Sequence, residues 1–214
     1  MQIVNAGYEI LDTLNGEDIL KKIERIARTC YKSEDLIGED TAERLVGNLI
    51  KRGHEAMLEH FSFSVKFTVD RGVSHEIVRH RIASFAQEST RYCNYGNKGG
   101  EITFIEPCYL KDSSISNWDT MYGAWRAMCE NAELMYLRMS KAGATPEESR
   151  AVLPTSLKTE LVMTTNLREW RHFFKLRAVG VTGKPHPQML EVSVPLLKDL
   201  QKQIPVIFDD LQVE

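Results

Sequence analysis

Hydrophobic and polar residues alternate most regularly over residues 61–69. The odd positions hold Phe61, Phe63, Val65, Phe67 and Val69, with polar residues between them. Successive side chains of a strand point to opposite faces, so this pattern predicts a strand with one buried face. The alternation also favours an antiparallel sheet, in which one face is commonly solvated. Weaker strand patterns occur at residues 3–11, 103–105 and 161–165.

Apolar residues three or four positions apart predict the helices. The first helix follows Asn15, a good N-cap, and its apolar face includes Ile19, Ile23 and Cys30. Further helices are expected from Thr41 to Gly53 and over residues 73–81, 118–139, 167–178 and 187–203. The aromatic and Met stripe of 118–139 is interpreted as core or subunit interface. This order of elements predicts a single α+β domain over residues 1–214, with a largely antiparallel sheet packed against long helices.

Composition narrows the class of protein. The chain has 214 residues, 43% of them hydrophobic, and a formal net charge of -3. No overall positive field attracts nucleic acid or an anionic membrane, so any anion site must be local. Four cysteines without a CxxC pair are typical of reduced thiols, and neither a secretory signal nor a membrane-spanning apolar run is present. We therefore expect a cytoplasmic location and neither a membrane nor a nucleic-acid partner.

Positive charge gathers in one short segment. Arg79-His80-Arg81 is followed within ten residues by Arg91. Crowded arginines repel one another unless an anion binds, and the guanidinium fork matches phosphate. Ser89 and Thr90 would complete such a cradle. On charge alone, a solvated basic face paired with Glu76 and Glu88 explains the segment equally well.

The spacing of this segment resembles the signature of the flavin-dependent thymidylate synthases. Seven residues separate Arg79-His80-Arg81 from Ser89, and Arg91-Tyr92 follows. Similar blocks occur in the family's order at residues 27–31, 54–60, 150–154, 166–173 and 176–178. The resemblance thus covers nearly the whole chain.

This resemblance implies a homotetramer whose sites are shared between subunits. It assigns FAD contacts to His54, Glu59, Arg79, His80, Arg81, Gln87, Asn166, Leu167, Arg168 and His172. It assigns dUMP contacts to Glu76, Arg79, Gln87, Glu88, Ser89, Thr90, Arg91, Arg177 and, from a neighbouring subunit, Arg150.

The implied reaction moves a methylene group from methylenetetrahydrofolate to C5 of the uracil, followed by a hydride from reduced FAD. NADPH would first reduce the flavin. Arg177 is the implied catalytic residue, because a fixed cation favours the N3-deprotonated uracil. Ser89 is assigned to binding, since the motif offers no adjacent general base. Ala56, Glu76 and the longer segment 179–184 before His186 depart from the family's pattern.

Three other interpretations explain less of the chain. His54 and His60 are six residues apart, whereas the zinc motif HExxH places its histidines four apart, so no metal site is expected. Pro107-Cys108 is similar, over two residues only, to the active site of the folate-only thymidylate synthases. A nucleic-acid module with Phe85, Tyr92 and Tyr95 as stacking platforms explains the local charge but not the distant blocks.

Overall fold

The computed structural model of the chain describes residues 1–97 and 100–213. These residues form two compact units, each assembled from separate segments of the sequence. The first unit comprises Met1–Gly7, Phe67–Arg79 and Phe85–Val162, and the second comprises Tyr8–Lys66, His80–Ser84 and Met163–Glu214. Among the described residues, no helix has the length and apolar content needed to cross a bilayer.

A four-stranded antiparallel sheet contains the strand that the alternating pattern predicts. Its order is β2 (Gly7–Ile10), β3 (Ser62–Asp70), β6 (Lys158–Asn166) and β4 (Ser84–Gln87). The apolar residues of β3, namely Phe63, Val65, Phe67 and Val69, are all buried. This confirms the predicted strand and the α+β fold. Strand β4 was not predicted, and β6 begins three residues earlier than expected.

The first unit packs a long helix against a two-stranded parallel sheet. β1 (Gln2–Val4) pairs with β5 (Thr103–Ile105), so the single strand predicted at 3–11 is wrong and is divided between two sheets. Helix α4 (Trp118–Lys141) contributes Cys129, Ala132 and Tyr136 to one core with Phe104. The shorter elements are α3 (Arg71–Ile77), η3 (Cys108–Leu110), α5 (Pro146–Ser149) and η4 (Arg150–Val152).

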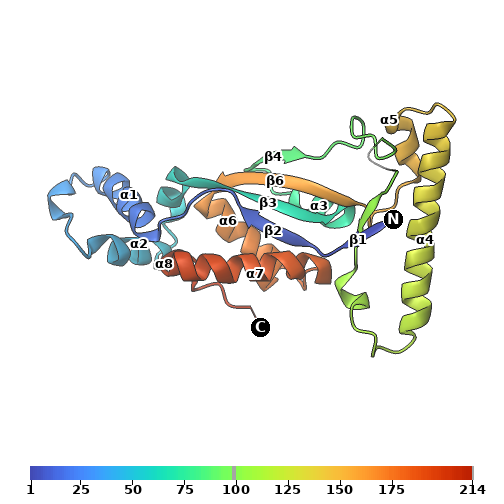
Figure 1. The fold of residues 1–214 in the computed structure, drawn as a ribbon. Helices are drawn as coiled ribbons and strands as arrows, with labels where there is room; N and C mark the ends of the chain where they lie inside the picture. Colours follow the sequence, from blue (N-terminus) through green and yellow to red (C-terminus); the bar gives the residue numbers. More distant parts are fainter. Residues whose placement is uncertain (98–99, 214) are drawn as a thin grey trace. The chain divides into compact units, whose positions relative to one another are not determined.

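The second unit begins with two helices that lie side by side, α1 (Gly16–Thr29) and α2 (Thr41–Lys51), as Figure 1 shows. The Asn15 side chain accepts a hydrogen bond from the Asp18 N–H and caps α1, as predicted. Cys30 is exposed, so its place on the buried face is wrong. The helix ends at Thr29, one residue before it. Short 3₁₀ turns follow at η1 (Glu34–Leu36) and η2 (Glu55–His60).

Aromatic side chains form the core of the second unit beneath β3. Helix α6 (Leu167–Phe174) places Trp170 on Phe63, with ring centroids 5.0 Å apart, and Phe174 against Phe208 of α8 (Pro205–Phe208). The π-helical turn η5 (Lys175–Val179) follows α6, and α7 (Pro187–Gln203) completes the core. The helices predicted at 167–178 and 187–203 are confirmed, the first of them with a changed final turn.

The helix predicted over 73–81 has other bounds. Asp70 caps α3 through a 2.8 Å hydrogen bond from the Val73 N–H, so the helix starts two residues early. It ends at Ile77, because the Arg79 N–H bonds to the Glu76 carbonyl only three residues back. The Arg79-His80-Arg81 motif therefore lies in the turn after α3 and not within a helix.

Candidate active site

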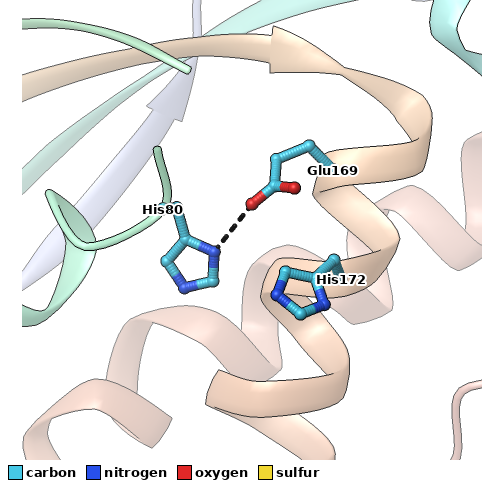
Figure 2. A group of neighbouring side chains, drawn as sticks. All are labelled: His80, Glu169 and His172. Atoms are coloured by element: carbon cyan, nitrogen blue, oxygen red, sulfur yellow. Dashed lines mark hydrogen bonds and ion pairs between the residues drawn. The ribbon is translucent and has the colours of Figure 1, made fainter. Parts of the chain in front are cut away.

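A buried histidine is the centre of a polar cluster in the second unit. His80 is only 4% exposed, and its Nδ1 lies 3.0 Å from Oε1 of Glu169 in the first turn of α6. The His80 ring meets Phe173 edge-on, with centroids 5.0 Å apart. The ring centroids of His80 and His172 are 5.7 Å apart. Figure 2 shows His80 facing Glu169 and His172 on one side of α6.

The contact with Arg177 shows which nitrogen of His80 carries the proton. The Arg177 Nε lies 3.3 Å from His80 Nε2, and every nitrogen of arginine is a donor. His80 Nε2 must therefore be the acceptor, and the proton of the neutral ring sits on Nδ1, from which it is donated to Glu169. Burial lowers the pKa of His80, and Arg177 and His172 lower it further against the opposing effect of Glu169. His80 is therefore neutral near pH 7.

The π-helical turn η5 holds Arg177 in this position. The Arg177 carbonyl accepts a 2.7 Å hydrogen bond from Ser193 Oγ on α7. Gly180 ends the turn with φ at +80°, where a Cβ atom would stand 2.9 Å from Pro185. Isolated π turns are frequent at functional sites, because the extra residue changes the direction of the side chains that follow.

A pocket of about 470 Å³ adjoins this cluster. It is lined by Glu55, Glu59, Ile82, Asn166, Arg168, Glu169, His172 and Lys175. Four residues predicted to contact flavin, namely Glu59, Asn166, Arg168 and His172, are thus gathered here. Arg168 pairs with Glu59 at 2.5 Å, and both side chains are about half exposed. Asn166 caps α6, since its Oδ1 accepts a 2.9 Å hydrogen bond from the Glu169 N–H.

Two other predicted flavin residues have different surroundings. His54 lines a neighbouring, more apolar pocket of about 350 Å³, which Arg168 also borders. Leu167 is fully buried, and its N–H donates to the Phe61 carbonyl at 3.0 Å. Leu167 therefore offers neither its side chain nor its N–H to a pocket.

The two arginines beside His80 are exposed. Among the described residues, the side chains of Arg79 and Arg81 have no hydrogen-bond or ion-pair partner. Glu88 pairs elsewhere, and Glu76 is half buried on α3. Glu88 therefore does not neutralise this basic segment. The guanidinium groups of Arg79 and Arg81 remain available to an anion.

In the first unit, Glu88 anchors the predicted nucleotide loop after β4. Its carboxylate accepts hydrogen bonds from Tyr95 Oη at 2.9 Å, Lys158 Nζ at 3.1 Å and the Glu160 N–H at 3.3 Å. Burial raises the pKa of Tyr95, and the charge of Glu88 raises it further. Gln87 donates to Ser74 Oγ at 2.9 Å. Glu88 is thus held by β6 and Tyr95, and Gln87 by α3.

The rest of this loop carries the cations. The Ser89 Oγ accepts from the Arg91 N–H at 3.2 Å, which forms a short turn. Arg150 donates to Oγ1 of the buried Thr90 at 3.2 Å within the same chain. The exposed Arg91 pairs with Glu147 at 2.9 Å. The structure therefore brings Ser89, Thr90, Arg91 and Arg150 together.

Replacing Glu88 with alanine should destabilise the first unit. The variant leaves the part-buried Lys158 ammonium without Glu88 and removes the acceptor of Tyr95. Loss of such a partner costs about 1–3 kcal/mol. Urea denaturation of Glu88→Ala beside Glu130→Ala, an exposed carboxylate on α4, measures the difference. Equal midpoints for the two variants would contradict the anchoring role.

His80, Glu169 and His172 also have the composition of a metal site, since their ligand atoms lie within 4.8 Å of one another. The Nδ1 of His80 is already bonded to Glu169, however, and Arg177 places a positive charge against the same ring. This arrangement favours an internal hydrogen-bond chain over a bound cation.

Comparison with known proteins places the chain in a family. The family model described as "Thymidylate synthase complementing protein" matches residues 9–206. The flavin-dependent thymidylate synthase of Pyrococcus furiosus is 32% identical over 80% of this chain and 68% of its own length. The flavin-dependent thymidylate synthase of Thermococcus onnurineus is 35% identical over 83% of this chain and 70% of its own length. The chain belongs to the flavin-dependent thymidylate synthase family.

The fold of this family member also matches a solved structure. The UMP/dUMP methylase PolB from Streptomyces cacaoi, bound with 5-Br dUMP, superposes with a TM-score of 0.83. The match covers 98% of this chain and 96% of that one at 21% sequence identity, so it supports the fold alone.

Sequence reasoning missed Glu169, the hydrogen-bond partner of His80. The signal was present, because Glu169 stands three residues before His172 and shares its helix face. Its partner His80 is 89 positions away in the sequence, so no local pattern could pair the two.

Proposed function

We propose that the chain methylates dUMP to dTMP, with FAD as its flavin, methylenetetrahydrofolate as carbon donor and NADPH as reductant. Family membership supports the reaction class. The observation that carries the proposal is the hydrogen-bond chain from Glu169 through His80 to Arg177, which lies beside a polar pocket. This hydrogen-bond chain connects His80 of the Arg79-His80-Arg81 motif to Arg177, which the resemblance implies is catalytic.

The residues that the resemblance assigns to FAD have the chemistry that FAD needs. A dinucleotide brings a pyrophosphate that needs cations, and Arg79, Arg81 and Arg168 supply exposed guanidinium groups. His172 and Asn166 offer polar groups at the pocket wall, and His54 borders the apolar pocket next to it. We assign these residues to FAD, with Glu59 and Gln87 in support.

The loop after β4 suits a nucleotide monophosphate. Arg91 and Arg150 bring two positive charges to Ser89 and Thr90. An exposed ion pair such as Arg91 with Glu147 is worth little, so a phosphate dianion can replace Glu147. We assign the dUMP phosphate to Ser89, Arg91 and Arg150. Glu76, Arg79, Gln87, Glu88 and Thr90 complete the proposed nucleotide set.

Arg177 has the proposed catalytic role of stabilising the uracil ring in its N3-deprotonated form. A bound reduced flavin supplies the hydride, and the folate supplies the carbon. The protein orients the two rings and excludes water, which is where much of the rate enhancement of cofactor enzymes arises. We further propose that a homotetramer completes each site, with residues shared between subunits.

The test is a visible spectrum of the purified protein, followed by NADPH addition with and without dUMP. Flavin bands that bleach, and bleach faster with dUMP, would support a flavin next to the nucleotide. Radiolabelled dTMP formed from dUMP and methylenetetrahydrofolate would establish the reaction. A colourless protein that takes up no added FAD would overturn the proposal.

Cys108→Ala should leave dTMP formation unchanged, because the proposed reaction uses no thiol nucleophile. Cys108 lies in η3 after Pro107 and is half buried. All four cysteines are free thiols, which suits the reducing cytoplasm that we propose as location. Initial rates at saturating dUMP measure the effect, and a variant that binds flavin normally but makes no dTMP would contradict it.

A further inference from the structure

We propose that Glu169 is a positioning residue that orients Arg177 through the tautomer of His80. Its carboxylate holds the ring proton on Nδ1, which leaves Nε2 as the acceptor for the Arg177 Nε–H. The catalytic importance of Arg177 rests on the proposed function above, whereas the hydrogen-bond chain itself does not.

Glu169 and His80 are buried, and the fold holds each of them in place. His80 is 4% and Glu169 7% exposed, so water does not compete strongly for their 3.0 Å hydrogen bond. Asn166 caps the α6 turn that carries Glu169, and a carboxylate at a helix N-terminus is electrostatically favoured. Phe173 packs against the His80 ring and limits its rotation. Figure 2 shows the carboxylate pointing at Nδ1 of His80.

The direction of the chain follows from donor counting. A neutral imidazole has one donor and one acceptor, and arginine has donors only. Only the Nδ1–H tautomer of His80 can accept from Arg177 Nε at 3.3 Å. Without the carboxylate of Glu169, the proton can move to Nε2, where two N–H groups would then face each other. The hydrogen bond between His80 and Arg177 would be lost.

Charge around the ring favours the same state. The groups that face His80 are Glu169 and His172 of α6 and Arg177 of η5. Protonation would turn Nε2 into a donor against a cation, and burial lowers the pKa of His80. The ring therefore stays neutral and accepting near neutral pH.

Anchoring one nitrogen of a planar guanidinium also fixes the direction of the other two. A catalytic cation displaced by about 1 Å can lose about 100-fold in rate. We therefore expect Glu169→Leu to lower kcat for dTMP formation about 100-fold, with a smaller change in the KM for dUMP. Glu169→Gln keeps an oxygen acceptor for Nδ1–H and should recover most of the rate.

The experiment reads the tautomer directly. ¹⁵N-histidine-labelled flavin-free protein at pH 7 gives two-bond ¹⁵N–¹H correlations, and His80→Gln assigns the His80 signals. Wild type and Glu169→Gln should show Nδ1–H, and Glu169→Leu should show Nε2–H. Glu24→Leu is the matched control, because it removes another buried, ion-paired helical carboxylate in the same unit. It should leave the His80 signals unchanged.

An Nε2–H or doubly protonated His80 in wild type would overturn the inference without any variant. So would Glu169→Leu with an unchanged tautomer, or with a changed tautomer and normal kcat. If wild type makes no dTMP but shows the Nδ1–H state that Glu169→Leu abolishes, the proposed function fails while the hydrogen-bond chain stands.

Discussion

Arg177→Ala should abolish most dTMP formation while the protein keeps its flavin. Removing one preorganised group that stabilises developing charge costs about 10²–10³ in kcat. Arg177 is half buried next to a neutral histidine, so little water is present to replace its charge. Flavin binding is expected to persist, because the proposed FAD contacts of Arg79, Arg81 and Arg168 are untouched.

The measurement is single-turnover conversion of dUMP, with the flavin content of the same sample taken from its visible absorbance. Arg177→Lys keeps a charge but lacks the fork and the Nε–H, so it should be intermediate. Arg25→Ala, an exposed arginine on α1, is the control for loss of a cation elsewhere in the unit. Wild-type turnover in Arg177→Ala would remove this residue from the mechanism.

Elements with a strong local period could be predicted from the sequence, whereas those defined by distant pairing could not. The alternation in β3 and the long apolar stripe of α4 are such local signals. The apolar run near the N-terminus was wrongly read as one strand, because the partners of β1 and β2 lie far along the chain. The four residues of β4 are too few to show a period.

The candidate site shows the same difference between residues found from local spacing and residues defined by distant contacts. Spacing draws attention to Arg79-His80-Arg81 and the loop that ends at Arg91, and the structure gathers part of the predicted residues around two local centres. The anchors of both centres were invisible, since Glu169 and Lys158 act on residues 89 and 70 positions away. Hydrogen-bond direction also depends on geometry, so the tautomer of His80 could not be inferred from its place in a motif.

The largest loss of stability is expected from Asp210→Ala. Arg171 of α6 is 1% exposed, and it donates to Asp210 at 2.6 and 2.7 Å and to Glu55 at 3.2 Å. The Ile207 carbonyl accepts from the same guanidinium. Removing Asp210 takes one carboxylate away from a buried cation, and breaking a fully buried pair costs about 3–5 kcal/mol. We expect a loss at or below the lower end of this range, because the Asp210 side chain is 49% exposed and Glu55 still faces Arg171.

The dependence of the unfolding free energy on pH in the acid range gives a second measurement. Burial alone would raise the pKa of Asp210, but the hydrogen bonds and charge of Arg171 outweigh it and hold the pKa below its ordinary value. Its contribution is therefore present above the ordinary carboxyl pKa and is lost as pH falls through the lowered one. Asp210→Ala should weaken this pH dependence, whereas Asp209→Ala, which leaves the Arg171–Asp210 contact in place, should not.

Asp210→Ala also separates the stability of α6 from its function. Arg171 faces the interior, whereas the adjacent His172 is exposed at the pocket, so one helix serves two networks. If the networks are independent, the variant unfolds at lower urea but retains the Nδ1–H tautomer of His80. A changed tautomer in still-folded Asp210→Ala would mean that the Arg171–Asp210 ion pair helps to set the site. Unchanged stability would contradict the anchoring role of Arg171 itself.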